Sequence, residues 1–303
     1  VLTEEQIDQR VKALVERVGD NDAVMGYFVC DEPWAHAYPE LGMWTAAYKK
    51  YAPGKIAYYN LLCKSCVRHS YQEYLDMFVD VVKPDLISYD HYHFLKNSDG
   101  NQYFLNLGLI RRAALDAKLP FLNIVQTCDS PAEGWRGPGE HELRWLTYTS
   151  LAYGAQGISH FRYDIGVWKD PSNPETPLPL YWALSRINRE FVAIATELQP
   201  LTSIGAYHCG TVPLGGEPLP ASAVFAPEPK SQEVLLGCFG RSRNKPTHVV
   251  VVNLDYKNAL TTTLVGPGPM EVFHPSTKTW IPGSSRMRLD LLPGGGALVR
   301  LVK

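Results

Sequence analysis

The sequence predicts an α/β fold in which a TIM-type (β/α) barrel domain is followed by an antiparallel β-sandwich. As far as residue 198, short apolar runs alternate with longer segments of helical period, which is the pattern of βα units. After Gln199-Pro200 only short strands recur, at intervals of about ten residues and separated by turns rich in Gly and Pro. We therefore expect one domain over 1–200 and a second over 201–303.

The first domain is predicted to hold five parallel strands, each a short run rich in Val, Ile, Tyr and Phe, at 24–30, 56–59, 86–89, 121–125 and 158–161. Helical periodicity fills the intervals between the strands, at 40–51, 71–82, 103–117 and 142–153, and a last helix is expected at 180–198. The opening segment 2–18 is predicted to be an amphipathic helix with Thr3 as its N-cap, and it does not have the pattern of a signal peptide.

The second domain is predicted from seven short apolar segments, at 221–225, 233–238, 248–254, 260–265, 270–273, 287–291 and 297–302. The simplest interpretation is a packing domain that covers the last helix, and the alternative is a sugar-binding module.

Composition excludes several classes of protein. The formal net charge of −2, without a large Lys/Arg cluster, argues against a nucleic-acid partner. No apolar stretch approaches the ~20 residues that would span a bilayer, so no membrane role is expected. The six cysteines lack the spacing of a disulfide framework and are expected to be free thiols. Cys63-Lys-Ser-Cys66 has CxxC spacing, but no partner motif follows at a zinc-site distance, so no metal is expected.

Polar and aromatic residues follow all five predicted strands. In a parallel barrel the carboxyl ends of the strands meet at one mouth, where catalytic residues lie. The residues at these ends are Asp31-Glu32-Pro33-Trp34, Asn60, Asp90-His91-Tyr92, Gln126 and His160-Phe161-Arg162-Tyr163. Loops are often polar for solvation alone, but this set of carboxylates, amides and rings is richer than solvation requires. It predicts a functional mouth.

The segment Gly26-Tyr-Phe-Val-Cys-Asp-Glu-Pro33 resembles the fourth-strand signature of the clan of retaining barrel glycosidases, where Asn-Glu-Pro is usual. In that clan the Glu is the acid/base, so the resemblance implies that Glu32 is the catalytic acid. The stretch from Leu143 to Arg162 resembles the last helix and eighth strand of β-galactosidase-like barrels. If the first visible strand is the fourth of the family, the resemblance implies an incomplete barrel of strands four to eight.

Glycoside hydrolysis requires a second carboxylate, as nucleophile or base. The family's nucleophilic Glu belongs on the seventh strand, where this chain has Gln126, which cannot do that chemistry. Asp90 is the best substitute, although it could equally be a structural partner of an Arg or a helix cap; Asp129, Glu133 and Asp164 follow it as candidates. Asp31 stands where the family has Asn, and its charge is expected to raise the pKa of Glu32 or its carboxylate to accept a hydrogen bond from the sugar.

The remaining candidates suit a sugar substrate. Trp34 and Trp135 are expected to stack on a pyranose face, and the polar groups expected to bind the sugar are Asp31, Asn60, His91, Tyr92, Gln126, His160 and Tyr163. Trp135 lies in a long Gly-rich loop, a type of loop that often closes over substrates. No cofactor is expected, because no dinucleotide or P-loop motif follows a strand, and GxSxG is also absent.

Two expectations follow from the incomplete barrel. Its two open edges favour a homo-oligomer that covers them. Because the seventh-strand Glu is missing, a non-catalytic carbohydrate-binding relative is the alternative to a glycosidase. The subcellular location is left open by the sequence.

Overall fold

The computed structural model describes residues 2–68, 70–173, 175–242 and 244–302. The protein is a mixed α/β structure with one large sheet. The chain divides into two compact units, the first made of Val1–Asp90 with Leu109–Asn123 and the second of His91–Gly108 with Ile124–Lys303. Residue 200, the predicted domain boundary, lies inside the second unit, and the two-domain assignment stays a prediction. In the described part of the chain no helix is long and apolar enough to cross a bilayer.

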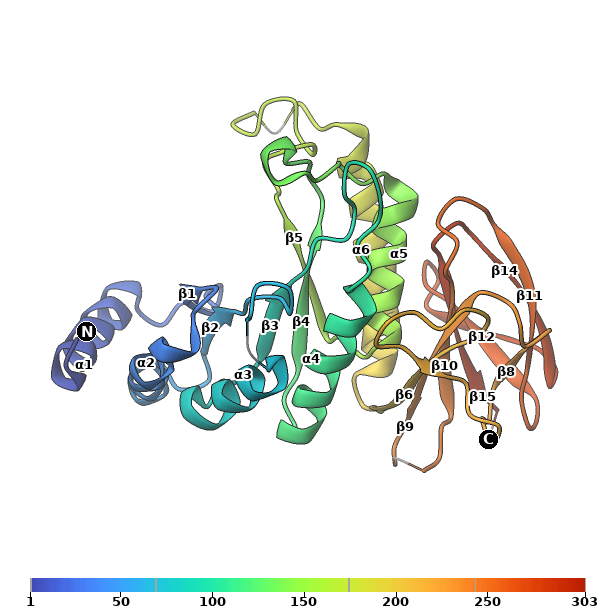
Figure 1. The fold of residues 1–303 in the computed structure, drawn as a ribbon, viewed down its shortest axis with the longest axis horizontal. Coiled ribbons are helices and arrows are strands. Elements are labelled where there is room, and N and C mark those ends of the chain that lie inside the picture. Colours follow the sequence, from blue (N-terminus) through green and yellow to red (C-terminus); the bar gives the residue numbers. More distant parts are fainter. Residues whose placement is uncertain (1, 69, 174, 243, 303) are drawn as a thin grey trace. The chain divides into compact units, whose positions relative to one another are not determined.

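The first unit alternates helices and strands, in the order α1 (Glu4–Val18), β1 (Gly26–Asp31), α2 (Tyr38–Tyr51), β2 (Ile56–Asn60), α3 (Tyr71–Met77) and β3 (Ile87–Asp90) (Figure 1). β1 and β2 are paired in parallel, and a parallel bridge between Leu61 and Tyr89 joins the end of β2 to β3. α3 continues as a π-helical segment, Phe78–Val82, which ends at Lys83 in the left-handed conformation before Pro84. The βα pattern predicted for this region is confirmed.

The first helix begins where the sequence predicts. The Thr3 hydroxyl accepts a hydrogen bond from the Gln6 N–H, and the Gln6 side chain accepts one from the Thr3 N–H, which completes a capping box. Asp8 of this helix accepts hydrogen bonds from Lys50 and Tyr51 of α2, so α1 and α2 are tied together.

The next elements lead from the first unit into the second. α4 (Tyr103–Ala117) has the predicted bounds, β4 (Phe121–Gln126) follows it, and α5 (Glu140–Ala152), β5 (Gly157–Phe161) and α6 (Pro179–Leu198) come next (Figure 1). β3, β4 and β5 form a three-stranded sheet in that order. All five strands predicted for this half of the chain are therefore present, within two residues of their expected ends.

After α6 the chain contains strands and no further helix among the described residues: β6 (Thr202–His208), β7 (Glu217–Pro218), β8 (Ala226–Glu228), β9 (Val234–Gly240), β10 (His248–Asn253), β11 (Leu260–Val265), β12 (Met270–His274), β13 (Thr279–Pro282), β14 (Arg286–Leu291) and β15 (Gly296–Leu301). They form a seven-stranded sheet, β13-β12-β15-β10-β9-β6-β7, and a three-stranded sheet, β14-β11-β8. Both sheets contribute to one core, which includes Val249 and Val299 from the large sheet and Leu264 and Leu289 from the small one.

The strand predicted at 221–225 is wrong. These residues form turns and bends, with the Ala223 N–H bonded to the Pro220 carbonyl, and β8 begins only at Ala226. The apolar signal came from Phe225, which is fully buried in the core of the two sheets although it lies outside any strand. β6 and β13 were not predicted, because their mixed sequences carry no clear two-residue alternation.

Close packing of α5 on the large sheet depends on a glycine in β9. A Cβ added at Gly237 would lie 2.2 Å from the carbonyl oxygen of Ala152, the last residue of α5. We expect Gly237→Ala to lower the free energy of unfolding by about 1–3 kcal/mol, because helix and strand backbones must separate. Urea denaturation measures this change, with Gly268→Ala as the control, since a Cβ at Gly268 has no atom within 4 Å. Equal losses in the two variants would contradict the close-packing explanation.

Candidate active site

The carboxyl ends of β1, β2 and β3 bring four predicted site residues of the first unit together. Asn60, at the end of β2, donates from Nδ2 to Oδ1 of Asp31 at 3.1 Å. Its backbone carbonyl accepts from the Glu32 N–H at 2.7 Å. Asp90 ends β3, and its side chain interacts with Glu32 by charge and by a hydrogen bond. Parallel strands ending at one edge thus assemble the group, as the sequence predicts.

The backbone at Glu32 has an unusual conformation. Its φ of 47° lies in the left-handed region, which is uncommon for a residue with a side chain and is found most often where function requires it. The turn leads directly into the buried Pro33, whose carbonyl accepts a hydrogen bond from the Tyr74 hydroxyl at 2.8 Å. The chain is therefore held on both sides of Glu32, by Asn60 before the turn and by Tyr74 after it.

The environment of Glu32 favours the protonated form of its carboxyl group. Partial burial raises the pKa of Glu32 to about 7, and the negative charges of Asp90 and Asp31 and the hydrogen bond to Asp90 act in the same direction. The expectation that Asp31 raises the pKa of Glu32 is confirmed. A carboxyl group with this pKa is partly protonated at neutral pH, which suits a general acid.

Asp90 is buried at the end of a strand whose four residues are all buried. Two adjoining carboxyl groups resist losing both protons, because the second charge would form next to the first. The raised pKa of Glu32 is the expected consequence of such a pair.

Replacing Asp31 by Asn tests the electrostatic account. The change removes one negative charge near Glu32 and keeps an oxygen that can accept the hydrogen bond from Asn60. We expect the pKa of Glu32 to fall from about 7, because ionisation no longer creates a charge beside Asp31. Carboxyl ¹³C NMR titration measures the pKa, with Asp76→Asn on the exposed face of α3 as the charge-matched control. A fall of the same size in both variants would contradict the assignment.

Two further groups of the first unit complete this site. Trp34 is half-exposed, and no aromatic ring contact is found for it among the described residues. Tyr74 of α3 was not predicted from the sequence. Its hydroxyl donates to the Pro33 carbonyl and accepts from the Leu62 N–H at 3.3 Å, which joins the loops after β1 and β2. The sequence did not mark Tyr74 as a site residue. It indicated only that Tyr74 lies on the buried face of the helix that begins after Ser70.

The other predicted site residues lie in the second unit. Tyr92 packs on Trp135 with ring centroids 4.4 Å apart and on Phe161 at 5.1 Å, so the loop tryptophan is part of an aromatic cluster. His91 and His160 are neutral at pH 7, since burial lowers the pKa of both and brings that of His91 to about 4. Nε2 of His160 bonds to Asn188 at 3.0 Å, whereas Tyr163 is exposed.

Gln126 does not face a ligand, which corrects the expectation that it binds a sugar hydroxyl. Its side chain is fully buried. Its Oε1 accepts from the Phe94 N–H at 2.9 Å, and its Nε2 donates to the carbonyls of Phe94 and Arg136 at 3.0 and 2.8 Å. The amide therefore holds the loops after β3 and β4 together, because a buried polar group needs partners of its own.

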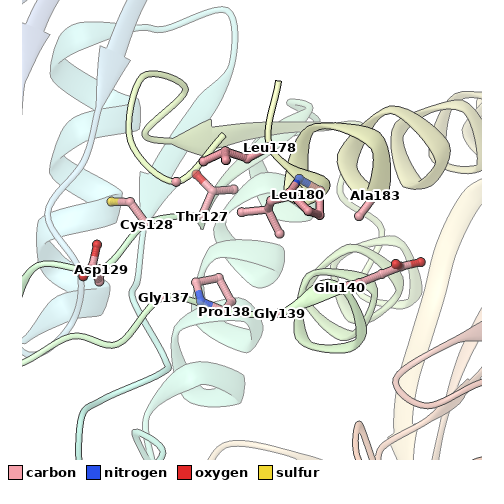
Figure 2. A pocket seen from close by; sticks show the side chains of 12 residues that line it. Thr127, Cys128, Asp129, Gly137, Pro138, Gly139, Glu140, Leu178, Leu180 and Ala183 are labelled. Carbon is pink, nitrogen blue, oxygen red and sulfur yellow. The ribbon is translucent and has the colours of Figure 1, made fainter. Parts of the chain in front are cut away.

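The three other candidates for the second catalytic carboxylate have different surroundings. Asp129 borders a cavity of about 470 Å³ in the second unit, formed by the loop after β4 and the start of α6. Figure 2 shows Thr127, Pro138 and Leu180 around it, with Asp129 and Glu140 at opposite sides of the view. Asp164 is paired with Arg162, and Glu133 lies in an exposed 3-10 turn. Of the three, Asp129 lines the cavity.

A larger cavity of about 860 Å³ lies elsewhere in the second unit and contains none of the predicted site residues. Charged side chains of both signs line it, among them Glu197, Arg241, Lys245, Glu271 and Arg300. Within the described residues no group of three His, Cys, Asp or Glu side chains is arranged to hold a metal ion.

No protein-family model matches the sequence, and no curated protein matches it. Several solved structures have a similar fold, among them the following two. A GH27 β-L-arabinopyranosidase from Geobacillus stearothermophilus, solved as a single-residue variant with arabinose, is 11% identical with a TM-score of 0.52; the match covers 99% of this chain and 62% of that one. An α-galactosidase I from Mortierella vinacea is 12% identical with a TM-score of 0.51, and the match covers 99% and 72%.

These structural neighbours are glycoside hydrolases with TIM-barrel-like folds, and the protein has a glycosidase-like fold of the same kind. The chain spans less than two thirds of the arabinopyranosidase. At such low identity the likeness concerns the fold, and the specific clan implied by Asp-Glu-Pro stays a prediction.

Proposed function

We propose that the protein is a glycosidase of the β-glycosidase type that cleaves O-glycosidic bonds by carboxylate acid/base catalysis. Glu32 is the general acid, and Asp90 is the nucleophile or base. The observation that carries this proposal is the Glu32–Asp90 pair at the strand ends, in which Glu32 has a pKa of about 7. The glycosidase-like fold supports it.

In the proposed reaction Glu32 gives its proton to the glycosidic oxygen as the bond to the anomeric carbon breaks. The Asp90 carboxylate attacks that carbon, or removes a proton from a water that does so. Without substrate Glu32 and Asp90 are hydrogen-bonded to each other. A sugar must therefore replace this contact, after which the Glu32 proton is directed to the substrate and Asp90 is freed as a carboxylate.

The proposed substrate is a carbohydrate, held without a cofactor or a metal. In the first unit Asp31 is the proposed polar contact beside Glu32, Asn60 supports it through a hydrogen bond to its carboxylate, and Trp34 is the proposed stacking group. In the second unit the proposed sugar-binding groups are His91, Tyr92, Trp135, His160 and Tyr163. Gln126 is left out of this set because the surrounding loops use its whole amide.

The second candidate is a carbohydrate-binding protein that does not hydrolyse its ligand. Gln126 favours this candidate, because it stands where the family resemblance places the nucleophilic Glu and its amide holds two loops together. A panel of aryl glycosides, assayed with the wild type and Glu32→Gln, separates the two. A glycosidase releases the aryl group from at least one substrate, and release from the aryl glycosides with poor leaving groups depends on Glu32. If none is released while sugars still bind, as measured by calorimetry, the binding protein is the correct assignment.

We infer further that the strands from β1 to β5 form an incomplete barrel with β1 at an open edge, and that the strands after α6 form a sandwich domain. β1 pairs with β2 alone among the described strands, and Met25 and Phe28 beside its edge are 71% and 62% exposed. An unpaired edge with exposed apolar side chains favours association.

We propose that a second copy of the chain covers this edge, which predicts a homo-oligomer. We propose no nucleic acid and no membrane as partners. Multi-angle light scattering at micromolar concentration is expected to give at least twice the mass of the chain. Phe28→Ser is expected to shift the equilibrium towards the monomer, whereas Val192→Ser, at an exposed apolar position of α6, serves as the control and should leave it unchanged. A monomeric wild type would contradict the proposal.

A further inference from the structure

The turn after β2 brings two thiols together. Sγ of Cys63 lies 3.1 Å from Sγ of Cys66, and the Cys66 N–H donates to the Cys63 carbonyl at 3.1 Å. This hydrogen bond closes a four-residue turn, in which the first and last Cα atoms are within ~7 Å. A disulfide needs a Cα separation of ~4.4–6.8 Å and a sulfur separation of ~2.05 Å. The backbone is thus suited to a disulfide, and the sulfurs need to approach by only about 1 Å.

The turn lies beside the carboxyl pair of the first unit. The Tyr74 hydroxyl contacts the residue after Glu32 and the residue before Cys63, through the Pro33 carbonyl and the Leu62 N–H. Tyr71 adds a second link by donating to the Leu62 carbonyl at 2.7 Å. The pKa of Cys66 is raised to about 12, by burial first, then by Cys63, and also by the charge of Glu32. The thiol and Glu32 are therefore close enough to interact.

Solvent can reach this pair. Cys66 is exposed and Cys63 is partly exposed, whereas Cys128, Cys209 and Cys238 are buried. Cys30, in β1, is partly exposed, and its Sγ contacts the Asp31 carbonyl rather than another thiol. Among the described residues no third His, Cys, Asp or Glu side chain completes a metal site with the pair.

We propose that Cys63 and Cys66 are a redox-active dithiol that low-molecular-weight disulfides oxidise to an intrachain disulfide at the edge of the carboxyl site. The Cys63 thiolate attacks one sulfur of the reagent, and a mixed disulfide forms as the first reagent thiolate leaves. Cys66 then loses its proton and attacks Cys63 Sγ, which releases the second reagent thiolate. Two protein thiols are oxidised and one reagent disulfide is reduced to two thiols.

The test uses the reduced, folded full chain incubated with oxidised glutathione, quenched with acid, alkylated and digested with trypsin. Trypsin cleaves after Lys64, between the two cysteines, and after Lys55 and Arg68. An intrachain disulfide therefore appears as peptides 56–64 and 65–68 linked to each other, and this link is lost on reduction. We expect the linked pair in the wild type and in the control Cys30→Ser.

The single variants identify the order of the steps. Cys66→Ser is expected to stop at a stable mixed disulfide on Cys63, because the second thiol is missing. Cys63→Ser is expected to react more slowly, because the partial burial that raises the pKa of the Cys66 thiol remains when Cys63 is replaced. Alkylated peptides alone in the oxidised wild type, or linkage of either cysteine to Cys30, would overturn the proposal. Because mass alone is measured, the result does not depend on glycosidase activity.

Discussion

Glu32→Gln is expected to lower kcat on unactivated glycosides by ~10²–10⁴-fold, the contribution that general acid catalysis makes to such reactions. Glutamine keeps the size and polarity of the side chain but has no proton to give to the leaving oxygen. Steady-state kinetics on an alkyl glycoside measures the loss. The charge-matched control is Glu73→Gln on exposed α3, which lies outside the hydrogen-bonded group around Glu32 and should keep wild-type kcat.

The leaving group separates a lost acid from a damaged fold. An electron-poor aryl leaving group departs without protonation, so Glu32→Gln should lose much less activity on such a substrate than on an alkyl glycoside. Equal losses on both substrates would contradict the role of Glu32 as acid.

The pH dependence of the wild type provides an independent check of the same assignment. The acid must be protonated to act, so kcat/KM is expected to fall as the pH rises through about 7, the pKa of Glu32 in the sugar-free protein. In Asp31→Asn the fall of kcat/KM should occur at lower pH, because the pKa of Glu32 is lower. If kcat/KM falls at the same pH in the variant and the wild type, a group other than Glu32 controls it.

Asp90→Asn is expected to reduce kcat by at least ~10²-fold, because the amide neither attacks the anomeric carbon nor accepts a proton from water. The loss should extend to electron-poor aryl glycosides, unlike the loss in Glu32→Gln. Steady-state kinetics on the same two substrates measures both. If Asp90→Asn keeps wild-type kcat, Asp90 is a structural group, and Asp129 beside the 470 Å³ cavity becomes the next candidate.

The pH dependence of the stability of Asp90→Asn tests the contact between Glu32 and Asp90. The folded pKa of Glu32 is raised from 4.5 to about 7, so protonated Glu32 contributes stability that is fully present below pH 4.5 and is lost as the pH rises through about 7. Removing the charge of Asp90 should flatten this fall. Urea denaturation midpoints between about pH 4.5 and 7.5 measure the slope across this window. A slope equal to that of the wild type would contradict the Glu32–Asp90 coupling.

Much of the element order could be predicted from the sequence. Helix 103–117 has its predicted bounds, and Thr3 caps the first helix through bonds that involve only neighbouring residues. Such signals are local, since periodicity and capping depend on a few adjacent side chains. Phe225 shows the limit of this reasoning, because a fully buried residue in a loop has the same apolar signal as a residue in a strand.

The sequence by itself determined that Asp31, Glu32, Asn60 and Asp90 stand at the ends of consecutive strands, because the end of each apolar run is visible in the order of residues. Only the tertiary structure decided what these groups do to one another. It raised the pKa of Glu32 beside Asp90 and Asp31 and used the Gln126 amide to hold two loops. It also joined the loops after β1 and β2 through Tyr74. Charge coupling and partner choice depend on distances between segments far apart in the chain, and no local pattern encodes those distances.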